Sequence, residues 1–352
     1  MMRKEEFWLD VPVFQGGMGV GVSLGGLAGA VAAEGGAGTI STAQIGFRET
    51  DFAENSLRAN LRAIGKELEK AKKIAKGRGM TGVNIMTVTK HYGEYVREAV
   101  RQGADFIVSG AGLPMDLPSL TKESKVKLIP VVSSLKAAGV ICKRWMKKEH
   151  RLPDAVIIEG PQAGGHLGFS KEEAEQEGSR WYEDEIKRII HFLRELGQEH
   201  GTYIPVITAG GFRDNKDLLR QQELGADAIQ AATRFVVTEE CDAAPAFKQA
   251  YVNCQKEDIA IIKSPVGMPG RAIRNAFIKH TEQSRIPPEH CYQCLSVCNP
   301  RETPYCITQA LIRAVTGDVE NGLVFCGAKA WQEEQITTVH EVIREFMEVQ
   351  DM

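Results

Sequence analysis

The 352-residue sequence lacks the features that mark membrane, secreted and nucleic-acid-binding proteins. No apolar run approaches the roughly 18 residues that a membrane-spanning helix needs. Residues 1–10 contain two basic side chains but no apolar core, so they do not predict a secretory signal. Forty-three Lys and Arg side chains against 46 Asp and Glu predict no nucleic-acid-binding surface. We therefore expect a cytoplasmic protein with neither a membrane nor a nucleic acid as its partner.

Eight short apolar segments alternate with helix-like segments between residues 11 and 236. The expected strands are residues 11–18, 37–42, 82–86, 106–110, 127–134, 155–158, 203–209 and 228–235. Strands that alternate with helices form parallel βα units, and eight such units close into an α/β TIM (β/α)8 barrel. An open doubly wound sheet is the alternative. It is disfavoured because the first turn, residues 16–23, lacks the Gly-x-Gly-x-x-Gly spacing typical of that fold.

The expected domains are a barrel over residues 1–240 and a helical lid or cap over residues 241–352. Ser23 is positioned to cap the helix that runs to about residue 34, and Asp214 to cap a later helix. The helical periodicity of residues 331–350 predicts a terminal helix that docks on the rest of the chain.

Small and polar residues gather at the predicted strand ends. In a barrel these ends share one face, where active sites are built. After the sixth strand, glycines deliver a titratable side chain, His166, although a lone histidine in a loop is usually a surface residue. The small-residue turns 209–211 and 230–233 follow the last two strands. Turns of this kind expose backbone N–H groups and predict a phosphate site.

Several motifs occur in order along residues 11 to about 278. They are Pro12-Val-Phe-Gln-Gly-Gly-Met18, Gly82-Val-Asn-Ile-Met86, Ser109-Gly-Ala-Gly112, Ile129-Pro-Val-Val132, Glu159-Gly-Pro-Gln-Ala-Gly-Gly-His-Leu-Gly168, Pro205-Val-Ile-Thr-Ala-Gly-Gly211, Gly225-Ala-Asp-Ala-Ile-Gln-Ala-Ala-Thr-Arg-Phe235 and Gly267-Met-Pro-Gly-Arg-Ala-Ile-Arg-Asn275. With these motifs the chain resembles the FMN-dependent nitronate monooxygenases (2-nitropropane dioxygenases) and the related flavin-dependent enoyl-acyl-carrier-protein reductases.

The resemblance implies that FMN lies over the carboxyl face of the barrel. The cofactor-binding residues that it implies are Gly17, Met18, Asn84, Glu159, Gly164, Gly165, Ala209, Gly210, Gly211, Gln230, Ala231, Ala232 and Thr233. His166 would be the catalytic residue, either as a general base near pH 7 or as the group that receives an ionised nitronate. Ala232 departs from the family, which usually has glycine there. Its methyl group is tolerable beside a phosphate only if its φ is negative.

Two activities compete within the resemblance. In the first, the flavin oxidises an alkyl nitronate or a similar small substrate. In the second, NAD(P)H is the electron donor and an enoyl thioester is reduced. A non-catalytic electron-transfer flavoprotein is disfavoured by His166 and by the lid-like segment 267–275. The expected partner is a small-molecule substrate, and the sequence leaves a homodimer open.

Four of the eight cysteines, Cys291, Cys294, Cys298 and Cys306, form a C-x2-C-x3-C-x7-C pattern. In a reducing compartment this pattern indicates metal ligation before disulfides. Four thiolates can bind zinc or a [4Fe–4S] cluster, and we place the cluster ahead of zinc. The first three cysteines resemble the cluster motif of iron–sulfur flavoenzymes such as 2,4-dienoyl-CoA reductase, whose fourth cysteine lies further on. The alternative is a set of reduced, unligated thiols.

The other four cysteines have simpler expectations. Cys142, Cys241 and Cys254 fall on segments expected to be helical and are predicted to pack in the interior. Cys326 is an alternative fourth metal ligand, but packing in the last helical region is the preferred interpretation.

Overall fold

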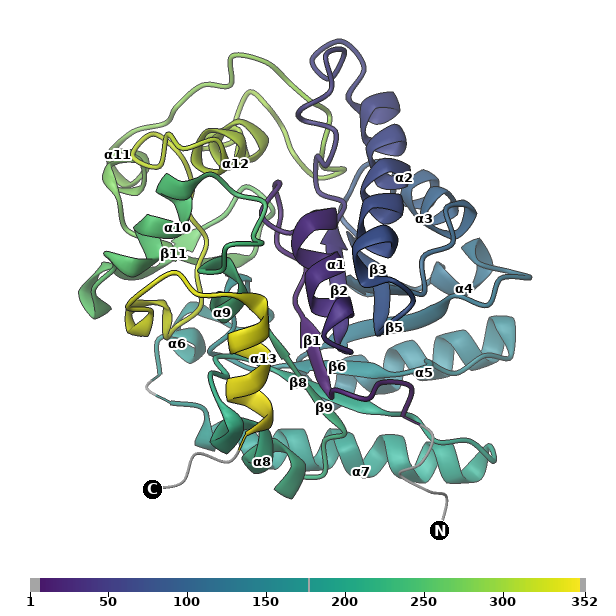
Figure 1. Ribbon diagram of the computed structural model, residues 1–352. Helices are drawn as coiled ribbons and strands as arrows, with labels where there is room; N and C mark the ends of the chain where they lie inside the picture. The colour runs from purple at the N-terminus through teal and green to yellow at the C-terminus, as the bar shows by residue number, and fades with distance from the viewer. Residues whose placement is uncertain (1–6, 177, 349–352) are drawn as a thin grey trace.

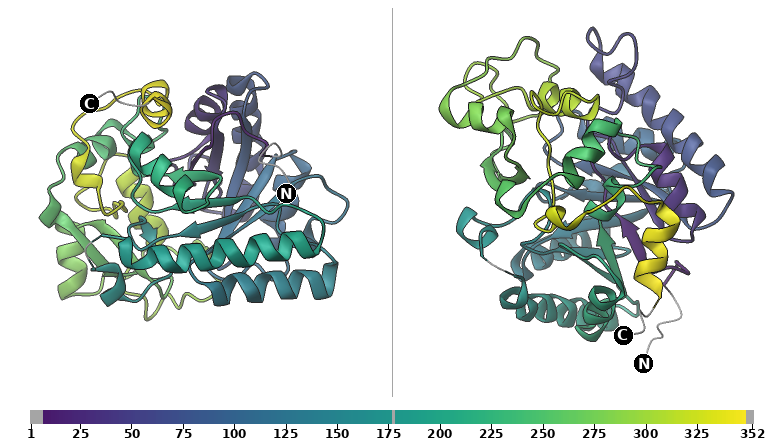
Figure 2. Two further views of the ribbon diagram at one scale, coloured as in Figure 1. Left: turned by 90° about the horizontal axis from the view of Figure 1, so that it is seen from below. Right: turned by 60° about the vertical axis from the view of Figure 1, so that its left-hand side comes forward.

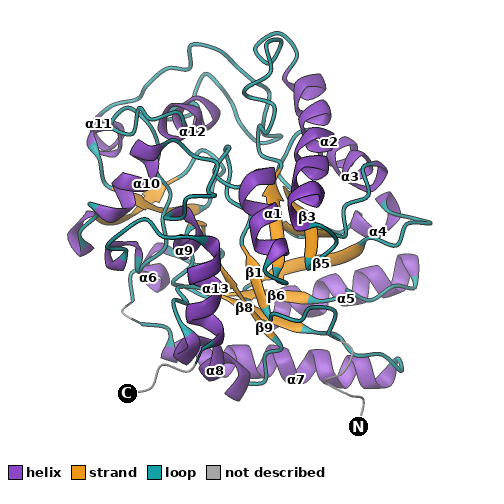
Figure 3. Ribbon diagram, viewed as in Figure 1, coloured by secondary structure: helices purple, strands orange, loops and turns teal. Residues whose placement is uncertain are grey.

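The computed structural model describes residues 7–176 and 178–348, and its centre is a closed barrel of eight parallel strands (Figures 1 and 3). The barrel strands, in spatial order, are β1 (Val13–Gln15), β2 (Ala37–Ser41), β3 (Met80–Met86), β4 (Phe106–Gly110), β5 (Lys127–Val132), β6 (Val156–Glu159), β8 (Val206–Ala209) and β9 (Ala228–Ala231). Strand β9 pairs with β1, with Gln230 opposite Phe14, which closes the circle. The TIM barrel expected from the sequence is confirmed.

Helices surround the strands of the barrel (Figure 2). They are α1 (Gly25–Ala33), α2 (Ser56–Ala75), α3 (Tyr92–Arg101), α4 (Leu117–Leu120), α5 (Leu135–Glu149), α6 (Lys171–Ala174), α7 (Glu183–Glu199), α8 (Asn215–Glu223), α9 (Thr233–Val236), α10 (Pro245–Val252), α11 (Ala276–Gln283), α12 (Ile307–Val315) and α13 (Val339–Met347). None of the helices in the described residues is long and apolar enough to cross a membrane.

Apolar side chains pack on both faces of the barrel strands. Inside, Phe14 and Phe106 are fully buried, with their ring centroids 5.7 Å apart in an edge-to-face arrangement. Strands β2 and β4 are buried along their whole length. Burial on both faces explains the continuous apolar runs that predicted these strands. Side chains such as these fill the interior of the barrel.

The start of α1 differs from the expectation. Ser23 does not cap the helix; its Oγ accepts a hydrogen bond from the Met18 backbone N–H at 2.8 Å. The distant carboxylate of Asp242 caps α1 instead, accepting from the N–H groups of Leu24 at 2.9 Å and Leu27 at 3.0 Å. By contrast, the expected cap of α8 is confirmed, because the Asp214 side chain accepts from the first backbone N–H groups of that helix.

Two element boundaries also differ. The expected strand 228–235 ends at residue 231, and residues 233–236 turn into α9, although their β-branched and aromatic side chains favour a strand. The expected terminal helix 331–350 begins only at Val339, where Thr338 and Glu341 form a capping box. Residues 349 and 350 of that expected helix lie outside the described residues.

The segment after residue 240, here called the cap, contains strands as well as the expected helices. Strands β10 (Ile259–Lys263) and β11 (Pro269–Ile273) form an antiparallel hairpin. A short strand from the barrel loop, β7 (Gly165–His166), joins the edge of β11, with His166 opposite Gly270. This small sheet brings the cap directly to the loop that carries the predicted catalytic histidine.

Candidate active site

A cavity of about 360 Å³ lies at the carboxyl ends of the barrel strands. Its wall includes His166 and all of the predicted cofactor-binding residues: Gly17, Met18, Asn84, Glu159, Gly164, Gly165, Ala209, Gly210, Gly211, Gln230, Ala231, Ala232 and Thr233. These residues come from five barrel strand ends or the loops that follow them, and the closed barrel collects them around one space.

The turn after β8 has a backbone that only glycine adopts easily. Gly210 has a φ of +133° and Gly211 a φ of +78°, both in the region that favours glycine. A Cβ atom on Gly210 would lie 3.3 Å from the Cα atom of Gly160. One on Gly211 would lie 3.1 Å from the Cβ atom of Gln162. The turn therefore presents bare backbone to the cavity, which is how proteins approach a phosphate closely.

In the turn after β9, Ala232 has the negative φ that an alanine beside a phosphate requires. Ala232 has a φ of −125°, so its methyl group causes no backbone strain where the family usually has glycine. After the neighbouring strand β1, Gly17 packs tightly on Asn84, because a Cβ atom on Gly17 would lie 2.4 Å from the Asn84 Cβ atom. Because Gly17 has no side chain, a flat ligand can lie close to the backbone at this position.

His166 lies in β7 and is held by cap residues. Its Nε2 atom is 2.8 Å from the Ser264 Oγ atom. Its ring packs against Phe325 with ring centroids 5.0 Å apart. Burial lowers the pKa of His166 to about 4, so the imidazole is neutral at pH 7. The histidine is therefore a much weaker base than the general base near pH 7 that the sequence suggested, because the cap removes it from water.

Glu159, at the carboxyl end of β6, has the opposite shift. Burial raises the pKa of its carboxyl group to about 8, and the positive charge of Arg271 opposes this shift only in part. Glu159 is thus mostly protonated at pH 7 and can donate a proton. One cavity contains a neutral imidazole and a protonated carboxyl group, and groups whose pKa values are pushed apart in this way are candidates for acid and base roles.

Arg271 organises the loop between these two groups. It is 3% exposed, and its guanidinium donates hydrogen bonds to the backbone oxygens of Pro161 at 2.9 Å and Ala174 at 2.6 Å, and to that of Ala163. Since all three acceptors are carbonyls of the loop after β6 or of α6, one cap side chain fixes the backbone that leads to His166.

The positions of the cysteines differ from the expectation in two respects: the metal site and the helical location of the buried thiols. Within residues 7–176 and 178–348, no three Cys, His, Asp or Glu side chains come together closely enough to hold one metal ion. Cys142 is buried in α5, as predicted. Cys241 and Cys254 are buried but lie outside helices. Cys326 is 2% exposed in the cavity wall and packs with core residues, which fits packing better than metal ligation.

Sequence reasoning missed the cap residues of the site. Ser264 and Phe325, which contact His166, carry no recognisable signal and come from segments far along the chain. Arg271 lies inside the quoted motif 267–275, but no role was predicted for it. Gln162 and Gly327 also line the cavity. A Cβ atom on Gly327 would lie 2.6 Å from the Thr233 Oγ1 atom, so the cap closes directly over the second small-residue turn.

A closed parallel barrel with a cavity at its carboxyl face that contains both Glu159 and His166 has the architecture of a TIM-barrel enzyme. A family model described as nitronate monooxygenase matches residues 2–348. The chain belongs to the nitronate monooxygenase family, which is a family of oxidoreductases.

Individual relatives are more distant. A probable nitronate monooxygenase of Staphylococcus saprophyticus is 27% identical over 195 residues, which cover 55% of this chain and 50% of the relative. A probable nitronate monooxygenase of Staphylococcus aureus strain Newman is 29% identical over 173 residues, which cover 49% of this chain and 44% of the relative. The chain thus spans about half the length of the curated relatives that it matches.

Solved structures match over almost the whole chain. FabK from Thermotoga maritima superposes with a TM-score of 0.72 and is 26% identical, with 96% of this chain and 92% of FabK covered. A nitroalkane oxidase from Streptomyces ansochromogenes has a TM-score of 0.70 and is 18% identical, with 96% of each chain covered. At that identity the second likeness supports the fold alone.

Proposed function

We propose that this protein is an FMN-dependent oxidoreductase that oxidises alkyl nitronates or similar small anions. The observation that carries the proposal is that the bare-backbone turns at Gly210 and Gly211 share one cavity with a neutral His166. The Gly210–Gly211 turn supplies a place for a phosphate, and His166 supplies a polar group for a substrate. Membership of the nitronate monooxygenase family supports the same reaction class.

The cavity suits FMN better than FAD. The turns at 209–211 and 230–233 would hold one phosphate, and the first turn lacks the spacing with which proteins bind dinucleotides. Gly17, Met18, Asn84 and Gly165 would line the flavin ring. When bound, FMN supplies an acceptor for the two electrons that leave the substrate. A cavity of about 360 Å³ is within the usual range for small-molecule sites.

The properties of His166 favour a substrate that is already ionised. A base with a pKa of about 4 is poorly suited to remove a proton from carbon at neutral pH. A neutral imidazole can instead donate an N–H to a nitronate oxygen, while its Nε2 atom stays near the Ser264 hydroxyl. We therefore propose that His166 binds and orients the nitronate anion, and does not generate it.

An enoyl-thioester reductase with NAD(P)H as the donor is the second candidate. Glu159 favours it, because a carboxyl group with a pKa of about 8 keeps its proton at neutral pH and could protonate the carbon next to the one that receives the hydride. The likeness to FabK, an enoyl reductase neighbour of 26% identity, supports this candidate as well.

Spectroscopy of the anaerobic protein separates the two candidates. We expect a yellow protein that releases FMN on heating and whose flavin absorption is bleached by alkyl nitronate. FAD in the supernatant would contradict the cofactor assignment. Bleaching by NADH or NADPH and not by nitronate, followed by reoxidation with an enoyl thioester, would establish the reductase in place of the nitronate oxidation proposed here.

A further inference from the structure

The connection between α11 and α12, residues 284–306, is a long loop without helices or regular strands. Loops of more than about 12–15 residues without secondary structure are uncommon inside compact domains and are usually functional or disordered. This loop carries Cys291, Cys294, Cys298 and Cys306, and the flavin chemistry proposed above uses none of them.

The first part of the loop is fixed to the barrel. The Lys90 N–H donates to the Cys294 carbonyl at 3.1 Å, and the Ser296 N–H donates to the Val88 carbonyl at 2.9 Å. The ring of Tyr292 stacks on Phe52 with ring centroids 5.2 Å apart. The segment that holds the first three cysteines is therefore anchored on both sides, which a disordered connection would not be.

The second part of the loop folds back toward its own beginning. Arg285 donates to the carbonyls of Thr303 at 2.9 Å and Pro300 at 2.8 Å, and the Ile286 N–H donates to the Pro304 carbonyl at 2.8 Å. These bonds bring the chain back to Cys306, the residue that begins α12. The fourth cysteine is thereby returned to the neighbourhood of the other three.

Cys294 and Cys298 pack on one apolar cluster that contains Tyr305 and Ile307, the two sequence neighbours of Cys306. No three of the thiols converge on one point within the described residues. A single zinc with bonds of about 2.3 Å would need its sulfurs only about 3.8 Å apart. A cluster binds each cysteine through a different iron atom and suits more widely spaced thiols.

The site would lie beside the cavity without being part of it. Cys294 and Cys298 belong to the same apolar cluster as Met268, Leu311 and Phe325. The last three also line the cavity, whereas none of the four loop cysteines does. The loop cysteines and the cavity therefore border on the same apolar cluster.

We propose that Cys291, Cys294, Cys298 and Cys306 bind one [4Fe–4S] cluster. Four cysteines in one anchored loop supply the full ligand set that such a cluster requires. Binding converts the four thiols to thiolates with release of their protons, and the cluster then joins the two parts of the loop. The proposal does not depend on which substrate the flavin oxidises.

Metal analysis of the full-length protein, purified without oxygen, tests the proposal. We expect iron and acid-labile sulfide in equal amounts, together with a broad absorption that dithionite bleaches. Cys291→Ala should abolish iron binding, and because this side chain is exposed the variant should still fold. The matched control is Cys142→Ala, which removes a thiol buried in α5 and should leave the iron content unchanged.

Three outcomes would overturn the cluster: zinc in place of iron, no metal after anaerobic handling, or full iron content in both Cys291→Ala and Cys298→Ala. FMN is measured in the same samples. A protein with iron and sulfide but without flavin would contradict the proposed function and leave the cluster standing, so the two failures are distinguishable.

Discussion

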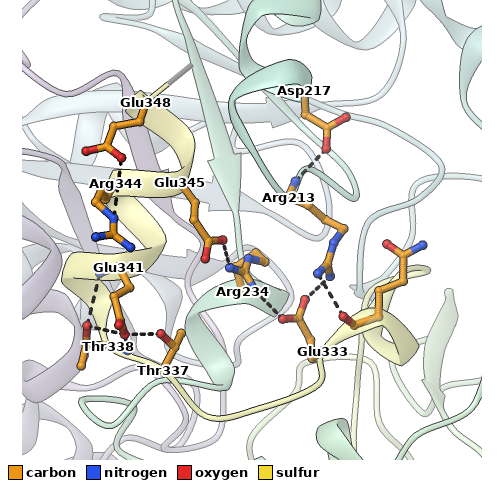
Figure 4. Close-up of polar contacts among 11 residues, drawn as sticks. Arg213, Asp217, Arg234, Glu333, Thr337, Thr338, Glu341, Arg344, Glu345 and Glu348 are labelled. Atoms are coloured by element: carbon orange, nitrogen blue, oxygen red, sulfur yellow. Dashed lines mark hydrogen bonds and ion pairs between the residues drawn. The ribbon is translucent and has the colours of Figure 1, made fainter. Parts of the chain in front are cut away.

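Arg234 and Glu333 form an ion pair with an N–O distance of 2.6 Å, and the Glu333 side chain is only 1% exposed (Figure 4). A second arginine, Arg213, pairs with the other carboxylate oxygen of Glu333. Arg213 follows the Gly210–Gly211 turn and Arg234 follows Thr233, so one cap carboxylate joins both turns that are proposed to hold the phosphate. Glu345 of α13 adds a further ion pair to Arg234.

We expect Glu333→Gln to lower both stability and FMN affinity. Removing one partner of a buried ion pair typically costs about 3–5 kcal/mol, because the remaining charges stay buried without compensation. If the loss of this ion pair weakens FMN binding at the phosphate turns by about 1.4 kcal/mol, FMN affinity falls about tenfold. Thermal unfolding and FMN titration measure the two effects. Glu348→Gln, which breaks an exposed pair with Arg344, is the control and should change neither quantity appreciably.

Replacing Gly210 with valine should abolish FMN retention. A side chain at a φ of +133° is strained, and its Cβ atom would lie 3.3 Å from the Gly160 Cα atom, so the turn that is proposed to hold the phosphate would have to shift. Gly77→Val is the matched control, since Gly77 also has a positive φ but has no atom within 4 Å of a Cβ position. FMN content is compared at equal folded protein, as judged by circular dichroism. A Gly210→Val protein with full FMN content would refute the phosphate assignment.

His166→Ala should lower kcat/KM for nitronate by roughly 10²- to 10⁴-fold, the range typical of positioned polar and acid–base groups. His166→Asn should recover part of this loss, because an amide can still donate a hydrogen bond to the anion. In the wild type the imidazole becomes charged only as the pH falls toward about 4. An activity change that follows a pKa near 6.5 would show that the histidine is accessible to water and would contradict the buried geometry.

Glu159 should make the stability of the protein depend on pH in a definite direction. Its pKa rises from 4.5 to about 8 in the folded state. Between these values the unfolded chain loses the proton while the folded chain keeps it, so stability falls as the pH rises and levels off above about pH 8. Glu159→Gln should remove this slope, which unfolding in denaturant at pH 5 and pH 8 can detect. Equal slopes in both proteins would place the carboxylate in contact with water.

Glu159 also distinguishes the two candidate reactions. Enoyl reduction needs a proton, so the wild-type rate should fall above about pH 8 and Glu159→Gln should lose most of this activity. Nitronate oxidation starts from an anion and should be much less affected by the same substitution. Steady-state rates with both substrates, measured on one preparation, show which reaction depends on the acid.

The barrel and its rim were predictable from the sequence because both depend on local patterns. Continuous apolar runs predict strands buried on both faces; Gly210 directly follows one of them, and His166 lies in the loop after another. The supports of the site were not predictable, because they depend on contacts between distant parts of the chain. Asp242 caps α1 from 215 residues away in sequence, as its bond to Leu27 shows. Ser264 meets His166 across a separation of 98 residues. Neither contact has a local pattern in the sequence.

The pairing of β7 with β11 makes the histidine part of the cap's sheet. The backbone of Gly165 and His166 is therefore bonded to the cap, while the residues proposed to hold the phosphate lie in the barrel turns after β8 and β9. The position of His166 therefore depends on the cap, which the buried ion pairs of Glu333 also join to the barrel turns. A protein cut after residue 240 would keep the barrel strands but lose the strand against which His166 is aligned.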